Sequence, residues 1–507
     1  MTQADVCLIL EGTYPYTLGG VSSWTQSIIE GFPELTFYLI SMVPTKEGNV
    51  QKYTLPKNVV GMDHIYLQDM DLGEDVLDVG YTNELFQIIE KNILQMQFKP
   101  RLKDMQMLMD CLEKSPKKLG KKVLLNSDAS WKMSQRIYRS SIGDGSFINY
   151  FWSLRSLLSG FMSTMLMDLP DCHVYHSFCT GFAGLLLAKA RLKTGRPCLV
   201  TEHGIYTNER RIEISSATWL NEQSFLDLQI TKKSYQFSVK DMWTETFSGY
   251  SRLCYEVSDK IITLFKDNQE CEIVDGADPE KMLVIPNGID IEKFGFIERE
   301  ASSKPVVALI GRVVQVKDVK TFIKAVALLK EKMPEVEVYI LGPFEEDSEY
   351  FHECIELARF LKIEEEITFT GQVDITSYLP KIDVAVLTSI SEAQPLASLE
   401  AGACGIPSVM TNVGSCYDIA HGDAEEHPRL GQGGVVVPLV NPDEVAAAIY
   451  RLLSDPEFYQ QCSQAIRQRV KKYYAKSDML RKYREIYSEL IIRSKNSEES
   501  WQESALR

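Results

Sequence analysis

The sequence predicts an α/β protein built from two domains. A chain of 507 residues is longer than one hydrophobic core usually accommodates, which favours two cores over one. Apolar residues make up 45% and charged residues 24% of the chain, and both proportions are typical of a globular protein. Short apolar runs alternate with stretches of helical spacing, and this alternation is typical of sheets covered by helices.

The predicted first domain covers residues 1–290 and opens with a strand at Asp5–Leu10. The pair Gly19-Gly20 follows this strand and precedes a helical stretch from Ser22. Glycine pairs permit close approach of the backbone to a ligand. Most such pairs are only turns, so this signal is weak when taken alone.

Residues 61–170 are charged, helical in spacing and rich in methionine, and we interpret them as a helical insertion in the first domain. Two roles fit such an insertion, a surface for a partner or a cover for one side of a substrate site. Its lysine pairs, Lys117-Lys118 and Lys121-Lys122, are more typical of a solvated surface than of a site.

Later in the first domain, Leu199–Glu202 reads as a strand that is followed by His203. An imidazole at the end of a strand can serve in catalysis. The alternative is a hydrogen-bonded structural histidine, which is the commoner case for an isolated histidine.

The predicted second domain, 291–455, has a buried strand at Val306–Ile310 that runs into Gly311, Arg312 and then Lys317. This pattern places two cations at the carboxyl end of a parallel strand, where open α/β sheets bind ligands. Arginine and lysine both match phosphate oxygens. Either cation alone is more typical of ordinary surface charge.

Two glutamates follow the next predicted strand, Asp383–Leu387. We expect Glu392 on a loop and Glu400 about two turns into a helix, roughly 12 Å further along. The free N–H groups at the start of that helix favour an anion such as a diphosphate between the two acids. The alternative is a solvated helix with two unrelated glutamates.

Three further segments complete the expected organisation. The Pro286-Asn287-Gly288 turn lies where the chain passes into the second domain. A C-terminal helix is expected over 456–493, and the polar residues 494–507 are expected to be disordered.

The formal charge of −16 excludes a polyanion such as nucleic acid as the expected partner and disfavours electrostatic docking on anionic lipid. The start of the chain contains neither a basic leader nor an apolar run long enough to span a membrane, so we expect a cytoplasmic protein. Eleven cysteines without a Cys-x-x-Cys pair fit a reducing compartment and do not indicate a metal site.

The glutamate pair Glu392 and Glu400, with Gly311-Arg312 and Lys317 upstream, resembles the retaining glycosyltransferases of family 4. The resemblance implies the GT-B fold, two Rossmann-like domains facing across a cleft, with neither a metal ion nor any cofactor besides the UDP-sugar substrate. It implies that Arg312 and Lys317 neutralise the departing diphosphate and that Glu392 contacts the donor sugar.

The same resemblance assigns the ribose hydroxyls to Glu400 and extends the donor site over further residues. These are Gly19, Gly20, Asn287, Gly311, Pro395 and Leu396, with His203 near the reacting sugar. Ala393-Gln394 and Ser415 depart from the common family pattern, which leaves the choice of sugar open.

The opening of the chain, including Glu11-Gly12-Thr13-Tyr14 and Ser22-Ser23-Trp24, and the segment Thr201–Tyr206 are similar to the glycosyltransferases of bacterial Pel exopolysaccharide synthesis. That resemblance implies polymerisation of amino sugars from UDP-GalNAc, UDP-GlcNAc or UDP-glucose onto a glycan acceptor. It also implies recruitment to the inner membrane by Pel assembly proteins. The alternative is a non-catalytic nucleotide-sugar-binding scaffold that regulates a membrane polysaccharide assembly.

Overall fold

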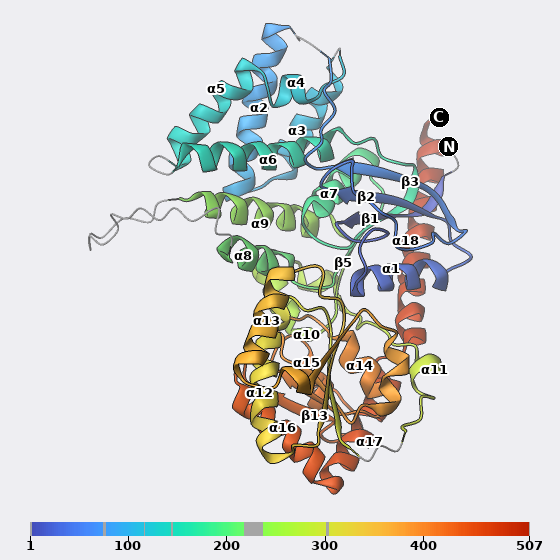
Figure 1. Cartoon of the computed structure of the whole chain (residues 1–507). Helices are drawn as coiled ribbons and strands as arrows, with labels where there is room; N and C mark the ends of the chain where they lie inside the picture. The colour runs from blue at the N-terminus through green and yellow to red at the C-terminus, as the bar shows by residue number, and fades with distance from the viewer. Residues whose placement is uncertain are drawn as a thin grey trace. The chain divides into compact units, whose positions relative to one another are not determined.

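The computed structural model describes residues 3–74, 78–115, 117–142, 146–216, 237–300 and 304–505. It divides the chain into two compact units (Figure 1). Unit 1 comprises Met1–Val284 and Arg484–Arg507, and unit 2 comprises Ile285–Tyr483. The sequence predicted the change of domain at 290/291, and the units divide six residues earlier, between Val284 and Ile285.

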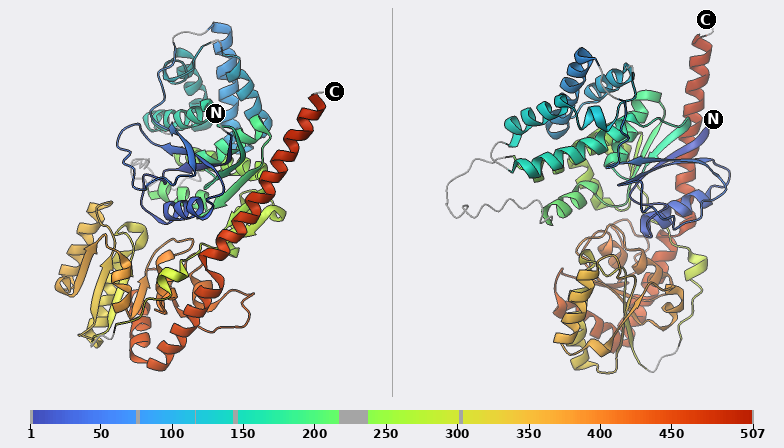
Figure 2. Two further views of the ribbon diagram at one scale, coloured as in Figure 1. Left: turned by 90° about the vertical axis from the view of Figure 1, so that its right-hand side faces the viewer. Right: turned by 45° about the horizontal axis from the view of Figure 1, so that its top comes forward.

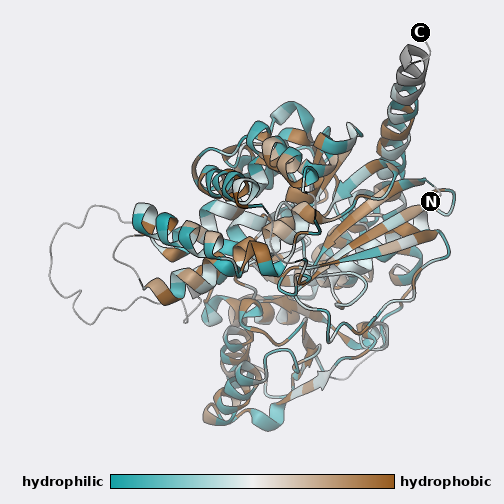
Figure 3. Cartoon of the chain, turned by 90° about the horizontal axis from the view of Figure 1, so that it is seen from above, coloured by the Kyte–Doolittle hydropathy of each residue, from teal (hydrophilic) through white to brown (hydrophobic). Residues whose placement is uncertain are grey.

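Unit 1 is organised around a parallel sheet with the strand order β3-β2-β1-β4-β5-β6-β7. Its strands are β1 (Ala4–Glu11), β2 (Phe37–Val43), β3 (Val59–Tyr66), β4 (Cys172–Ser177), β5 (Cys198–Glu202), β6 (Lys260–Thr263) and β7 (Met282–Val284). The described helices are α1 (Gly20–Gly31), α2 (Val79–Phe98), α3 (Leu102–Glu113), α4 (Lys121–Leu124), α5 (Asp128–Ile137), α6 (Phe147–Leu166), α7 (Phe182–Thr194), α8 (Tyr206–Ser216), α9 (Val239–Val257), α10 (Lys266–Val274) and part of α18 (Lys476–Ala505), besides a π-helix at Tyr138–Ile142 and a 3-10 turn at Pro279–Lys281. Hydrophobic residues concentrate on the strands of this sheet (Figure 3).

Helices α2 to α6 lie between β3 and β4 in the chain and form the helical layer of unit 1 (Figure 1). The sequence predicted an insertion over 61–170, and most of that range is helical. Its first residues are not, because β3 (Val59–Tyr66) pairs in parallel with β2 at the edge of the sheet. Most β3 residues are only half-buried, so the strand has no strong apolar pattern to reveal it.

Unit 2 contains a second parallel sheet, in the order β10-β9-β8-β11-β12-β13. Its strands are β8 (Val306–Ile310), β9 (Glu337–Leu341), β10 (Ile367–Gly371), β11 (Val384–Leu387), β12 (Ser408–Thr411) and β13 (Gly434–Val437). Its helices are α11 (Ile291–Phe294), α12 (Val319–Lys332), α13 (Ser348–Phe360), α14 (Leu396–Ala403), α15 (Cys416–His421), α16 (Pro442–Ser454) and α17 (Pro456–Tyr473), with 3-10 turns at Gln315–Lys317, Glu364–Glu366, Ile375–Ser377 and Leu379–Lys381.

The sheet of unit 2 is buried on both faces. In β8, Val307 and Leu309 join one apolar cluster, while Ala308 and Ile310 join another on the opposite face. The strand is therefore hydrophobic throughout, as parallel strands covered by helices usually are.

The C-terminal region differs from the single helix expected over 456–493 and the disordered tail expected over 494–507. Helix α17 ends at Tyr473, and α18 starts at Lys476 and continues to Ala505 (Figure 2). The intervening residues pair with Ile289, whose N–H donates to the Tyr474 carbonyl at 2.7 Å. The tail extends an existing helix and contains no proline or glycine, so no new nucleation is needed. Residues 506–507 lie outside the described ranges.

The second half of α18 packs within unit 1. Tyr487 is buried there, and its hydroxyl lies 2.7 Å from Nδ1 of His176. Arg493 forms an ion pair of 2.6 Å with Asp259. Helix α18 therefore belongs to unit 2 up to Tyr483 and to unit 1 from Arg484 onward. Of the helices in the described residues, none is both long and apolar enough to cross a membrane.

Candidate functional site

The sequence-predicted cations and acids of unit 2 lie at the carboxyl ends of two neighbouring strands, β8 and β11. From β8 the sheet continues to β9 on one side and to β11 on the other, so the strand order reverses at this point. Open α/β sheets bind ligands at such a switch point because the loops on its two sides diverge and leave a crevice.

The loop after β8 carries Gly311, Arg312 and Lys317. Gly311 lies against Gly342 at the end of β9, where a Cβ on Gly342 would collide with the Gly311 carbonyl. Arg312 directs Nη1 to both carboxylate oxygens of Glu346, at 2.5 and 2.8 Å. Both partners of this ion pair are substantially exposed. The pair therefore holds the guanidinium in a solvent-accessible position at the end of the sheet.

Glu392 follows β11 and lies opposite the β8 loop. Its Oε1 accepts hydrogen bonds from Nζ of Lys317 and, at 2.8 Å, from the Ser389 hydroxyl. The side chains of Lys317 and Glu392 are mostly buried, with 20% and 14% exposed, so this pair is less screened than the one at Arg312. The sequence did not single out Ser389, because a serine in a polar loop carries no distinguishing pattern.

The two loops are joined by hydrogen bonds to backbone carbonyls. The Thr388 hydroxyl donates to the carbonyls of Lys317 and Asp318, at 3.1 and 3.0 Å. The Ile390 N–H donates to the Val316 carbonyl at 2.8 Å. These bonds fix the positions of Lys317 and Glu392 relative to each other before any ligand binds.

A third loop supports Glu392 from the end of β12. Gly414 has a φ of +51° in a conformation that favours glycine, and a Cβ there would collide with the carbonyl oxygens of Glu392 and Ala393. The Ser415 N–H donates to the Ala393 carbonyl at 2.9 Å. Gly414 therefore permits the close approach that positions the loop of Glu392.

Helix α14 begins directly after this loop, with Pro395 as its N-cap and Leu396 as its first residue. No side chain caps its N-terminus, and its first turn contains no acidic residue. The first backbone N–H groups of a helix have no partner within the helix and carry partial positive charge. The start of α14 is thus suited to an anion.

Glu400 is the fifth residue of α14, just over one turn from its start, because the helix begins only at Leu396. The sequence placed it two turns along. Burial raises the pKa of Glu400 to about 7, while the charge of Lys293 acts to lower that pKa. Glu400 is therefore a partly buried carboxyl that exchanges its proton near neutral pH.

Asn287 joins the same region through Gln394. The Asn287 N–H donates to Oε1 of Gln394 at 2.6 Å. Both side chains are buried, and among the described residues neither Oδ1 of Asn287 nor Nε2 of Gln394 has a hydrogen-bond partner. A buried polar atom without a partner is a candidate ligand contact. Gln394 departs from the family pattern, and the structure assigns it a positioning contact that the sequence did not predict.

The remaining candidates lie in unit 1. Gly20 is the first residue of α1 and Gly19 is its N-cap, and both are exposed. His203 follows β5 and contacts Trp24 of α1 edge-on, with 4.6 Å between ring centroids. Burial lowers the pKa of His203 to about 4, so the imidazole is neutral at pH 7. Its Nε2 is buried without a hydrogen-bond partner in the described part of the chain.

The sequence missed two acids beside these residues. Glu11, at the end of β1, accepts from the Ala183 N–H at 3.0 Å and from the Tyr206 hydroxyl at 2.7 Å. Glu202 is fully buried and accepts from the Tyr255 hydroxyl and, at 3.2 Å, from the Tyr206 N–H. Burial raises the pKa of Glu202 to about 7. Their positions at the ends of β1 and β5 were the sequence signal that could have identified them as candidate site residues.

Within unit 2, then, the structure brings Lys317 into contact with Glu392 and Asn287 into contact with Gln394, whereas Arg312 is paired with Glu346. Gly19, Gly20 and His203 belong to unit 1. Among the described residues, no three His, Cys, Asp or Glu side chains are placed to hold a metal ion.

Known proteins resemble the chain in both sequence and fold. The fold resembles Anabaena HepE in complex with UDP, with a TM-score of 0.59 and 14% identity over 96% of this chain and 100% of that one. It also resembles sucrose-phosphate synthase from Thermosynechococcus elongatus, with a TM-score of 0.58 and 15% identity over 96% and 99%. These likenesses show the class of the fold, which is GT-B.

Two family models match the sequence, one in each half. "Domain of unknown function (DUF3492)" matches residues 4–280, and "Glycosyl transferases group 1" matches residues 290–469. The chain therefore belongs to the DUF3492 family, whose model covers more than half of its length, and carries a group 1 glycosyltransferase domain in its second half.

Individual curated relatives match part of the chain. The D-inositol 3-phosphate glycosyltransferase of Kineococcus radiotolerans is 28% identical over 40% of this chain and 50% of its own length. The glycogen synthase of Mycobacterium tuberculosis is 31% identical over 42% and 50%. The chain spans about half the length of these curated relatives.

Proposed function

We propose that the protein is a retaining glycosyltransferase that transfers a sugar from a UDP-sugar donor to a growing exopolysaccharide. The observation that carries this proposal is the contact between Lys317 and Glu392 at the carboxyl ends of β8 and β11, directly before the uncapped start of α14. The group 1 domain and the likeness to a UDP complex of HepE support it.

The cations of this site would act on the diphosphate. Arg312 and Lys317, with the N–H groups that follow Pro395 and Leu396, offer fixed positive charge to the phosphate oxygens. Charge develops on the diphosphate as the bond to the sugar breaks, so preorganised cations lower the barrier more than they stabilise the bound donor.

The acids of the site would hold the two ends of the donor. Glu392 accepts from the hydroxyls of the sugar, while Lys317 and Ser389 keep its carboxylate oriented. Glu400 accepts from the ribose hydroxyls, which favours its ionised form. Asn287 lies beside the nucleotide, and Gly311 lets the backbone approach it.

We propose that residues of unit 1 also contact the donor. Gly19 and Gly20 approach the donor phosphate with exposed backbone. His203 lies near the reacting sugar and acts as a neutral hydrogen-bonding group, because the low pKa of about 4 excludes an imidazolium at pH 7. We propose no metal ion and no cofactor.

The finer proposal is that the enzyme is of the PelF type. Its donor would be UDP-GalNAc, UDP-GlcNAc or UDP-glucose, and its acceptor an amino-sugar glycan. It would act in the cytoplasm and be brought to the inner membrane by the Pel assembly proteins. The N-terminal motif around Glu11 and the Thr201–Tyr206 segment support this assignment.

UDP release by the full chain tests the proposal. Each of the three donors is incubated with oligosaccharides of N-acetylgalactosamine or N-acetylglucosamine, with and without EDTA. We expect acceptor-dependent release with one donor, unchanged by EDTA, and retained anomeric configuration in the product by NMR. Binding of a donor in calorimetry without release under any condition would favour the non-catalytic scaffold. Inverted product would refute the retaining mechanism.

A further inference from the structure

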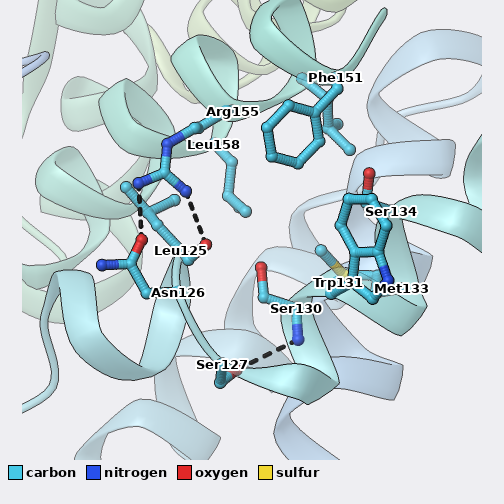
Figure 4. Close-up of a pocket in the computed structure, with 11 residues that line it drawn as sticks. Leu125, Asn126, Ser127, Ser130, Trp131, Met133, Ser134, Phe151, Arg155 and Leu158 are labelled. Atoms are coloured by element: carbon cyan, nitrogen blue, oxygen red, sulfur yellow. Dashed lines mark hydrogen bonds between the residues drawn. The ribbon is translucent and has the colours of Figure 1, made fainter. Parts of the chain in front are cut away.

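A pocket of about 260 Å³ lies between α5 and α6 in the helical layer of unit 1 (Figure 4). Buried aliphatic side chains line it, namely Leu125, Met133, Leu154 and Leu158. Trp131 and Phe151 line one side, with 5.6 Å between their ring centroids. None of the residues assigned to the sugar-nucleotide site belongs to this pocket.

A fixed cation lines the other side of the pocket. The Arg155 guanidinium donates to the Leu125 carbonyl at 2.7 Å and to Oδ1 of Asn126 at 2.6 Å, and Figure 4 shows it opposite the aromatic rings. These two bonds use two of its five N–H donors. The pocket thus combines aliphatic and aromatic side chains with one cation and with the polar side chains of Asn126, Ser127, Ser130 and Ser134.

Large apolar side chains continue from the pocket onto the surface. Trp131 is 42% exposed, and on α6 Ile148 and Trp152 are 68% and 61% exposed. Ile148, Trp152 and Arg155 are spaced four and three residues apart, so they share one face of α6. Contiguous exposed apolar side chains that surround a hollow are typical of interaction sites.

The sequence segment that carries α5 has a charge opposite to that of the whole protein. Residues 99–139, which include α3, α4 and α5, contain eleven Lys and Arg but four Asp and Glu, a net charge of +7. Since the chain sums to −16, the remaining residues sum to −23. Arg139 and Lys132 of this segment are exposed close in sequence to Trp131, and Lys132 forms an ion pair of 2.6 Å with Asp128. An acidic partner is therefore repelled elsewhere and attracted here.

We propose that the pocket between α5 and α6 receives a large apolar side chain from an acidic amphipathic helix of a partner protein. A bilayer does not account for the pocket, because it would contact the exposed Ile148 and Trp152 first and leave the interior of the pocket empty. A helix can insert one apolar side chain and place carboxylates near Arg155 and Lys132.

A library of random 16-residue peptides displayed on phage, selected against the full chain, tests this site. We expect enriched peptides with a Leu, Phe or Trp anchor and Asp or Glu three or four residues away. Synthetic copies are measured by fluorescence anisotropy. We expect Trp131→Ala to weaken binding at least tenfold, and an increase from 50 to 300 mM NaCl to weaken it at least threefold.

Matched variants distinguish peptide binding in the pocket from nonspecific hydrophobic binding. Phe98→Ala removes an aromatic side chain of α2 that is 61% exposed and does not line the pocket, so we expect a change below threefold. Lys132→Glu combined with Arg139→Glu keeps the pocket and reverses nearby charge, so we expect at least fivefold weaker binding. This variant also keeps the test valid if Trp131→Ala lowers the melting temperature. UDP binding should be unchanged in all three variants.

Several results would overturn the proposal. They are the absence of enriched peptides, enrichment without acidic residues, or equal binding by Trp131→Ala and the wild type. Binding to vesicles of equal phosphatidylglycerol and phosphatidylcholine that is lost in Trp152→Ala but kept in Trp131→Ala would assign the face to a bilayer instead.

Discussion

The ion pair between Arg312 and Glu346 leads to a specific prediction about nucleotide binding. Both oxygens of Glu346 lie within 2.8 Å of Nη1 of Arg312, the position that a phosphate oxygen would occupy in the proposed site. A bound diphosphate must compete with this carboxylate and tolerate its negative charge. Glu346→Gln removes that charge while keeping the size of the side chain, so we expect tighter binding of UDP.

The expected gain is modest because the pair is exposed. The two side chains are 41% and 53% exposed, and solvent-exposed ion pairs contribute about 0.2 to 1 kcal/mol. Repulsion between Glu346 and a phosphate charge roughly 6 Å away adds about 0.7 kcal/mol in water. Together these terms give about 1 kcal/mol, or roughly a fivefold lower dissociation constant.

Isothermal titration of UDP into the full chain measures this effect. Glu349→Gln is the matched control, because it removes an equal charge from an exposed residue on the first turn of α13 and so tests for a general charge effect. The gain should shrink as NaCl is raised from 50 to 500 mM. Unchanged or weaker binding by Glu346→Gln, in a protein whose wild type binds UDP, would refute the reasoning. An equal gain in Glu349→Gln would refute it as well.

Four further predictions follow from the site. Arg312→Ala and Lys317→Ala should each raise the barrier to transfer by about 2 to 4 kcal/mol, seen as lower kcat/KM in UDP release; normal release by both would contradict their phosphate role. Glu392→Ala should lower turnover while UDP binding in calorimetry changes little, and the reverse pattern would mean that it holds the nucleotide instead. Glu400 has a folded pKa of about 7, above its ordinary 4.5, so the free energy of unfolding should fall as pH rises from 4.5 through 7, by up to about 3 kcal/mol. Denaturation at several pH values should show a smaller decrease in Glu400→Gln than in the wild type, because Glu202, with its own pKa of about 7, still contributes to the decrease in both. Gly414→Ala should collide with the Glu392 carbonyl and, at φ +51°, destabilise the fold by about 1 to 3 kcal/mol while also weakening donor binding; a variant as stable and active as the wild type would show that the loop adapts.

Much of the local structure could be predicted because it depends on neighbours in the chain. The run Val306–Ile310 is uniformly apolar, and Arg312 and Lys317 follow it directly, so their position at a strand end follows from burial alone. Strand β3 was not predicted, because its residues are only half-buried at a sheet edge and therefore show no apolar pattern. The helix beyond residue 494 was not predicted, because its polar composition is typical of a disordered segment even though the residues continue an ordered helix.

The sequence by itself determined the α/β class, the two sheets and the identity of the charged residues that end their strands. Only the tertiary structure decided which charges meet: Lys317 with Glu392, seventy-five residues away, and Arg312 with Glu346. It also decided the proton affinity of Glu400, which depends on what buries that carboxyl. The physical reason is the distance along the chain over which each effect acts. Backbone preference and the apolar pattern of a strand are encoded by adjacent residues, whereas ion pairing and desolvation arise from strand order and packing, which join residues that are distant in the chain.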